Sequence, residues 1–242
     1  MKSYSNTYIF IFSTVMVIIV AILLSFVAEQ LRPIQEKNVA VEKKLDILKS
    51  VGEAKGINEA DNKDNYVEGE YQKYITDSYV INTAGNLQEG VDAFSVNIKV
   101  ELDKPFEERN LAIFVYTDDD GNQKYIIPLR GTGLWGPIWG YISFNEDYKT
   151  IYGAIFAHEK ETPGLGAEID QSWFQAQFVN KQIFDETGTF VSIQVKKGGA
   201  DSDDKHAVDA VSGGTITSVA LQEMMHACLV NYETYIKSKD KE

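Results

Sequence analysis

The sequence predicts an α+β fold, with one N-terminal transmembrane helix followed by a mixed α+β domain. Residues 8–28 (YIFIFSTVMVIIVAILLSFVA) carry no charge, and a helix needs about 20 apolar residues to cross a bilayer. Residues 91–102 alternate between apolar and polar side chains, which is typical of a half-buried strand. Residues 215–237 carry apolar side chains at helical spacing. Strand and helix patterns thus both follow the apolar run.

The N-terminal segment, residues 1–30, is predicted to be an uncleaved anchor that enters the lipid bilayer through residues 8–28. The alternative is a cleaved signal peptide, which has a basic start and a shorter apolar core. Only Lys2 is basic before the run, and no small-x-small cleavage site follows it. Lysines and arginines are more numerous just after the run, so the positive-inside rule favours a cytoplasmic position for the rest of the chain.

Residues 31–75 are predicted to form a juxtamembrane helix and an acidic connection. Pro33 is expected to end the first helix because proline lacks a backbone donor. Apolar residues at helical spacing predict a second helix over residues 35–51. Residues 58–70 (NEADNKDNYVEGE) have the composition of a solvated loop.

The remainder, residues 76–242, is predicted to be one domain of mixed structure. Its expected strands are residues 91–102, 110–116, 125–129, 141–143, 150–158 and 190–195, and its expected helices are residues 172–179 and 215–237. The Gly-containing segment 118–122 is expected to be a hairpin turn. The buried stripe of the last helix is expected to comprise Val219, Met225, Cys228, Leu229, Tyr232 and Ile236.

Composition excludes several classes of function. The formal net charge of −13 argues against a nucleic-acid-binding protein, which needs a basic face. Cys228 is the only cysteine, so the chain forms no internal disulfide and holds no Cys-based iron–sulfur cluster. His158, His206 and His226 are too scattered to predict a metal site.

Residues 209–218 (DAVSGGTITS) are the most informative segment. Ser212 is expected to be the N-cap of the last helix, and the glycines after it permit close approach of the backbone. The free N–H groups at a helix N-terminus bind anions, phosphate above all. An ordinary serine-capped helix is the alternative interpretation.

This segment resembles the flavinylation motif of the FMN-binding domain family, in which an acidic residue precedes a Ser-Gly-Ala-Thr core. The core here is Ser212-Gly213-Gly214-Thr215, with Asp209 upstream and Gly214 in place of the alanine. The resemblance implies a covalent FMN, joined to the Thr215 hydroxyl through its phosphate by a flavin transferase. Thr217 is the alternative acceptor.

Two further segments extend the resemblance. Residues 161–166 (ETPGLG) resemble the flavin-contacting loop of the family, and residues 133–135 (GLW) resemble a loop beside the flavin. Tight connections are the alternative interpretation of both. Residues 131–136 also read G-x-G-x-x-G, but no helix pattern follows, so a dinucleotide-binding fold is not predicted.

The resemblance implies a set of cofactor-binding residues and no catalytic acid or base. In addition to Thr215, the attachment site, they are Asp209, Val211, Ser212, Gly213, Gly214, Thr217, Leu134, Trp135, Glu161, Thr162, Leu165, Gly166 and Lys197.

Over nearly its full length the chain is similar to the C-subunit family of sodium-translocating NADH:quinone oxidoreductases. The apolar run, residues 31–38 (LRPIQEKN), both loops and the threonine motif occur in the order of that family. The similarity implies electron transfer in a complex that oxidises NADH, reduces ubiquinone and exports sodium, with other membrane subunits as partners. It also implies the cell inner membrane and, against the charge count, a periplasmic domain. The alternatives are a G-type subunit of an Rnf ferredoxin:NAD oxidoreductase and a non-catalytic anchored binding module.

Overall fold

The computed structural model describes residues 5–239, which fall into two compact units divided between Lys43 and Lys44. Helix α1 (Asn6–Ser50) begins in the first unit and ends in the second. Its apolar part is long and apolar enough to cross a membrane, a property that it shares with signal sequences.

The prediction that Pro33 ends the first helix is wrong, because α1 continues through it. Arg32 pairs with Glu36 at 3.1 Å across the proline and with Glu29 at 3.8 Å in the turn before it. Such pairs each stabilise a helix by about 0.2–0.5 kcal/mol. The helix expected over residues 35–51 is therefore the second half of α1.

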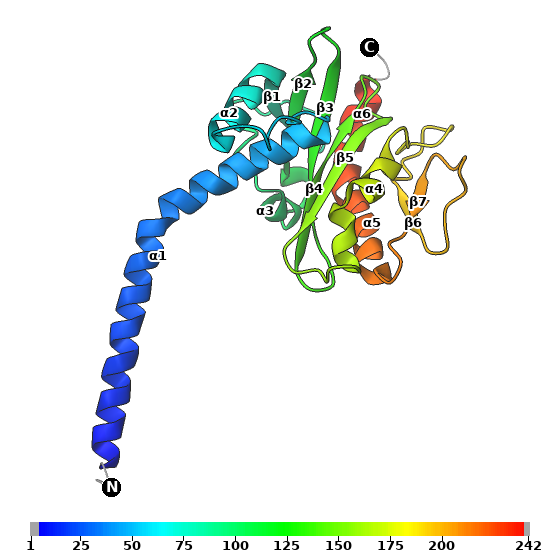
Figure 1. Ribbon diagram of the computed structural model, residues 1–242. Coiled ribbons are helices and arrows are strands. Elements are labelled where there is room, and N and C mark those ends of the chain that lie inside the picture. The colour runs from blue at the N-terminus through cyan, green and yellow to red at the C-terminus, as the bar shows by residue number, and fades with distance from the viewer. Residues whose placement is uncertain (1–4, 240–242) are drawn as a thin grey trace. The chain divides into compact units, whose positions relative to one another are not determined.

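The second unit contains a five-stranded antiparallel sheet whose strands follow one another in chain order (Figure 1). The strands are β1 (Ile75–Asn82), β2 (Asn110–Thr117), β3 (Gln123–Thr132), β4 (Pro137–Phe144) and β5 (Ile151–His158). The predicted β2–β3 hairpin is confirmed. In its turn the Asp118 carboxylate accepts hydrogen bonds from the Asp120 and Asn122 amides.

Short helices and a two-stranded parallel sheet complete the unit. The helices are α2 (Lys63–Tyr74), α3 (Ile98–Leu102), η1 (Phe106–Glu108), η2 (Gly166–Asp170), α4 (Ser172–Gln175), η3 (Ala176–Phe178), α5 (Thr215–Leu229), η4 (Val230–Tyr232) and α6 (Glu233–Lys239). The parallel sheet pairs β6 (Gln194–Lys196) with β7 (Ala207–Asp209). The helical prediction for residues 172–179 is confirmed, whereas only the end of the strand predicted over residues 190–195 is formed.

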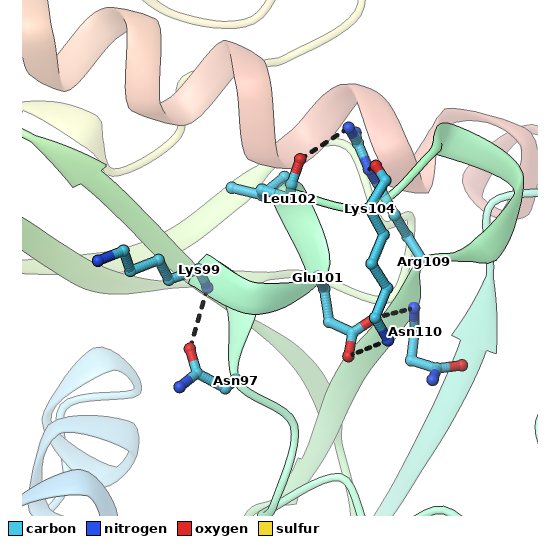
Figure 2. Close-up of polar contacts among 7 residues, drawn as sticks. All are labelled: Asn97, Lys99, Glu101, Leu102, Lys104, Arg109 and Asn110. Atoms are coloured by element: carbon cyan, nitrogen blue, oxygen red, sulfur yellow. Dashed lines mark hydrogen bonds and ion pairs between the residues drawn. The ribbon is translucent and has the colours of Figure 1, made fainter.

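The strand predicted over residues 91–102 is wrong, because this segment ends in helix α3. Its alternation is overridden by capping and by buried polar contacts. Asn97 caps the helix through the Lys99 amide. The buried Glu101 carboxylate accepts hydrogen bonds from the Asn110 amide and the Lys104 ammonium, both at 2.8 Å (Figure 2).

Arg109 fastens the end of the same segment. Its guanidinium donates to the carbonyls of Leu102 and Lys104, at 2.9 and 3.1 Å (Figure 2). It also donates to the Asn231 side chain at 2.8 Å. Because Asn231 lies in η4, the segment is tied to the C-terminal helices.

The solvated loop predicted over residues 58–70 is also wrong in its second half, where α2 begins. The Asn62 side chain caps α2 by accepting a hydrogen bond from the Asn65 amide. Val67 is fully buried, and Glu68 pairs with Lys44. The acidic composition of residues 58–70 therefore did not indicate that their second half begins a capped helix with one buried face.

The main core lies between the sheet and the C-terminal helices, with α5 packed on β3 (Figure 1). Tyr232 is buried and donates a hydrogen bond to the Ala112 carbonyl at 2.9 Å. Five members of the predicted buried stripe are buried, and the prediction is wrong for Val219. Val219 lies one helical turn after Ile216, on the exposed face of α5.

Cys228 is expected to resist thiol reagents in the folded protein. Burial raises the pKa of its thiol from 9.0 to about 11, so the reactive thiolate is about a hundredfold scarcer. Because this is the only cysteine, a mass increase after iodoacetamide treatment reports on it alone. We expect little labelling at pH 7.5 without denaturant and complete labelling in guanidinium chloride. Rapid complete labelling of the native chain would contradict the burial of Cys228.

Candidate functional site

Most of the predicted site residues come from three segments that are distant in sequence. They are the β3–β4 turn, the loop after β5, and the start of α5. Figure 1 shows the β3–β4 turn at the end of the sheet where α5 begins, and Gly131 at this end packs against Met224 of α5.

The β3–β4 turn supplies two exposed apolar side chains. The Gly133 amide donates to the Gly136 carbonyl at 2.7 Å and closes the turn, and β4 begins at Pro137. Leu134 and Trp135 are exposed at its tip. Because the G-x-G-x-x-G sequence connects two antiparallel strands, it does not belong to a dinucleotide-binding βαβ unit, as predicted.

The loop after β5 brings a third apolar side chain. Both the Leu165 and the Ala167 amides donate to the Thr162 carbonyl at 3.1 Å, which folds the loop back on itself. Gly164 has a φ of +75°, a conformation that glycine adopts without strain. Leu165 is exposed beside it.

The start of α5 differs from the expectation. Its N-cap is Gly214, and no side chain caps it, so the prediction of a Ser212 cap is wrong. Gly213, with a φ of +74°, turns the chain between Ser212 and the helix and leaves Ser212 exposed. The turn is instead held by Ser218, whose hydroxyl accepts a hydrogen bond from the buried Val211 amide at 3.1 Å.

An uncapped N-terminus has a chemical consequence. The first amides of a helix lack partners within the helix and lie at the positive end of its dipole. In α5 they begin at Thr215, whose side chain is partly exposed. Such an end binds phosphate and other anions.

Glycines bring the loop after β5 directly onto the start of α5. A Cβ atom on Gly213 would lie 2.6 Å from Leu165 Cδ2, and one on Gly214 would lie 2.9 Å from the Leu165 carbonyl oxygen. Both positions therefore favour glycine at this contact. Gly214 stands where the flavinylation motif has alanine, and its lack of a side chain lets the Leu165 backbone approach the start of α5.

Glu161 joins all three segments. Its side chain is only 4% exposed. Its carboxylate accepts one hydrogen bond from the Trp135 amide at 2.9 Å and one from the Thr217 hydroxyl at 2.6 Å. The backbone amide of Glu161 donates to His158 Nδ1 at 3.3 Å. Gly166 lies against the same carboxylate and leaves no room for a Cβ.

The two candidate acceptor threonines lie in different environments. Thr217 is 2% exposed and its hydroxyl is bound to Glu161. Thr215 lies two residues earlier, on the other side of the helix, and is partly exposed. The geometry therefore favours Thr215 over Thr217 as a site that an external group can reach.

Two predicted residues lie apart from this cluster. The Asp209 carboxylate accepts a hydrogen bond from the Ala200 amide at 2.6 Å and so orders the turn after β6. Lys197 is exposed in that turn, and no hydrogen bond or ion pair within residues 5–239 joins it to the three segments.

Sequence reasoning missed two residues of the apolar surface, Ile216 and Val219. They are 61% and 42% exposed and share one face of α5. Their i, i+3 spacing directly after Thr215 was a usable signal, but such spacing is more often found on a buried face.

Comparison with known proteins agrees with this geometry. Residues 133–230, which contain all three segments, match the FMN-binding domain family. The chain is 30% identical over 213 residues to the C subunit of the Na⁺-translocating NADH-quinone reductase of Vibrio vulnificus, covering 85% of this chain and 83% of the relative. It is 32% identical over 203 residues to the same subunit of Neisseria meningitidis serogroup B, with coverages of 79% and 77%.

Solved structures agree as well. The crystal structure of the corresponding protein from Parabacteroides distasonis superposes with a TM-score of 0.73 at 40% identity, covering 85% of this chain and 96% of that chain. The mixed helix and sheet domain is thus the fold of these subunits. The chain belongs to the family of C subunits of the Na⁺-translocating NADH-quinone reductase, an oxidoreductase complex.

Proposed function

We propose that this chain carries FMN covalently on Thr215 and passes electrons between cofactors of neighbouring subunits in a sodium-exporting NADH:quinone reductase. One observation carries the proposal. A partly exposed threonine stands at an uncapped helix N-terminus, among exposed apolar side chains from three separate segments.

The residues present fit FMN. The amides at the start of α5 suit a phosphate, as at other helix N-termini. The flat isoalloxazine ring needs an apolar surface, and monomeric soluble domains rarely leave such a surface open unless it binds something. Large exposed apolar side chains are available on the turn, the loop and the helix. They are Leu134, Trp135, Leu165, Ile216 and Val219.

Attachment of FMN to Thr215 is a phosphoryl transfer. The Thr215 oxygen would form a bond to the flavin phosphorus, its proton would pass to water, and a phosphoanhydride bond would break. The co-reactant is therefore a flavin dinucleotide, whose nucleoside monophosphate is the leaving group, and a flavin transferase is the catalyst. The position of Thr215 in the first turn of α5 places its hydroxyl beside the free amides that would bind the phosphate oxygens.

When bound, FMN supplies stepwise electron transfer, and the protein supplies position and electrostatics. The phosphate link is remote from the ring, so the surroundings of the ring set its potential. In this chain those surroundings are the β3–β4 turn and the loop after β5. Covalent attachment also retains the cofactor outside the cytoplasm, where a dissociated flavin is not readily replaced.

The setting is inferred from the family. The relatives are named as subunits of a Na⁺-translocating NADH-quinone reductase, so we assign other subunits of that complex as partners. We place the apolar part of α1 in the cell inner membrane. We place the soluble domain in the periplasm, because this position makes covalent retention of the flavin useful.

The test is to produce the full chain together with a flavin transferase and to search for flavin on the denatured protein. Trypsin is expected to release residues 206–237 as one peptide, which contains Thr215 and both neighbouring hydroxyl candidates. Ultraviolet-excited fluorescence in a denaturing gel, with an FMN-sized adduct localised to Thr215 by fragmentation, is the expected result. A dark band of unmodified mass would refute the covalent flavin and favour an anchored binding module.

A further inference from the structure

We infer that Glu161 is a positioning residue that holds the β3–β4 turn, with Trp135 at its tip (the Trp135 turn), against the start of α5. Loss of Glu161 should therefore release the flavin ring without preventing attachment of the flavin to Thr215. The inference rests on the proposed function of Thr215. Its central observation is a buried carboxylate that accepts hydrogen bonds both from the tip of the β3–β4 turn and from the first turn of α5.

Glu161 satisfies both of its oxygen atoms with donors from other segments. One oxygen accepts from the Trp135 amide, 26 residues earlier, and the other accepts from the Thr217 hydroxyl, 56 residues later. Each bond is of ordinary length. Together they hold the tip of the turn at a set distance from the first turn of α5.

Close packing leaves this carboxylate little freedom. A Cβ atom on Gly133 would lie 2.5 Å from one carboxylate oxygen, and a Cβ on Gly166 would lie 2.5 Å from the other. Two glycines on opposite sides thus admit the side chain, and neither oxygen can move far without losing its donor.

Among the described residues, no cation compensates the Glu161 carboxylate. Within the described part of the chain, no lysine, arginine or histidine forms an ion pair with Glu161. A buried carboxylate without a cation is costly, and a leucine or methionine would fill the space at a lower cost in free energy. Its presence at the junction of the three segments indicates a role in the site beyond packing.

The Thr215 hydroxyl is outside this arrangement. Thr215 shares the first turn of α5 with Thr217 but faces outward, and no hydrogen bond among the described residues joins it to Glu161. Loss of the Glu161 bonds should therefore free the Trp135 turn and leave the acceptor hydroxyl in place.

The test compares three variants of the full chain. Glu161→Met keeps the length of the side chain and removes both acceptors. Glu161→Gln removes the charge, but its amide can accept from Trp135 and donate to the Thr217 oxygen, so it should act as the conservative rescue. Glu159→Met is the matched control, because Glu159 is exposed in the same loop and pairs with Lys160 rather than with the site.

The first readout needs no flavin. In the unmodified protein, we expect exchange of the Trp135 amide hydrogen to become about tenfold faster in Glu161→Met, the effect of losing one hydrogen bond. It should stay near wild type in Glu161→Gln and Glu159→Met. Thr217→Val, which removes one donor and preserves shape, should accelerate exchange less and serves if Glu161→Met fails to fold.

The second readout uses the modified protein. We expect Glu161→Met to carry the adduct on Thr215 to the wild-type extent, with higher flavin fluorescence and lower fluorescence anisotropy because the ring is no longer held beside Trp135. Loss of the adduct, unchanged exchange and fluorescence, or failure of Glu161→Gln to rescue would overturn the inference. Absence of an adduct from the wild-type chain would instead refute the proposed function, and the exchange readout would still judge Glu161.

Discussion

Replacement of Thr215 by alanine is expected to abolish the covalent flavin completely while the domain stays folded. The change removes the only partly exposed hydroxyl in the first turn of α5. Thr215 is not part of the core, so the free energy of unfolding should change by no more than about 0.5 kcal/mol. In-gel flavin fluorescence and the mass of the 206–237 peptide measure the first effect, and thermal unfolding measures the second.

Two variants serve as controls for this result. Thr215→Ser preserves the nucleophilic oxygen and should retain an adduct. Ser202→Ala removes an exposed hydroxyl outside the three site segments and should leave modification unchanged. An adduct that persists in Thr215→Ala, on Thr217 or Ser212, would show that the acceptor has been assigned to the wrong residue.

Replacement of Phe156 by alanine is expected to lower the free energy of unfolding by about 3–5 kcal/mol, as for other buried aromatic truncations. Phe156 is 2% exposed on β5. Its ring centroid lies 4.9 Å from that of Phe178 and 6.3 Å from that of Phe174. The truncation would leave a cavity among these rings that the sheet cannot close.

Guanidinium chloride unfolding of the full chain in detergent, followed by circular dichroism, measures this loss. Phe106→Ala is the matched control because Phe106 is 43% exposed and lies outside the core, and its change should stay within about 0.5 kcal/mol. A loss below about 1 kcal/mol for Phe156→Ala would show that the three rings do not form a tightly packed core.

Short sequence patterns correctly predicted the elements of this fold that depend on interactions between residues close in sequence. The β2–β3 hairpin followed from an acidic, Gly-containing turn between apolar runs, and α5 followed from its helical spacing. Residues 91–102 show where such signals fail. Their alternation is that of a strand, yet Asn97 capping and contacts with residues outside the segment select a helix.

In the candidate site, too, some features follow from local sequence and others depend on contacts between distant segments. Thr215 could be proposed as the attachment site from the sequence alone because its motif is continuous in sequence. The role of Glu161 was not, because its partners lie 26 and 56 residues away and its burial depends on the completed fold. The sequence suggested a flavin contact for Glu161, whereas both of its carboxylate oxygens are engaged with the protein itself.

The order of the strands also bears on when the protein can mature. Every neighbouring pair in the five-stranded sheet is adjacent in the chain, so the sheet can assemble while synthesis continues, through contacts of short sequence separation. Thr215 comes after the last of these strands, at the start of α5, which ends at Leu229 and is followed by η4 and α6. A flavin transferase that recognises the folded acceptor would therefore modify only chains in which the sheet and α5 have both formed, so the flavin would also mark a folded domain.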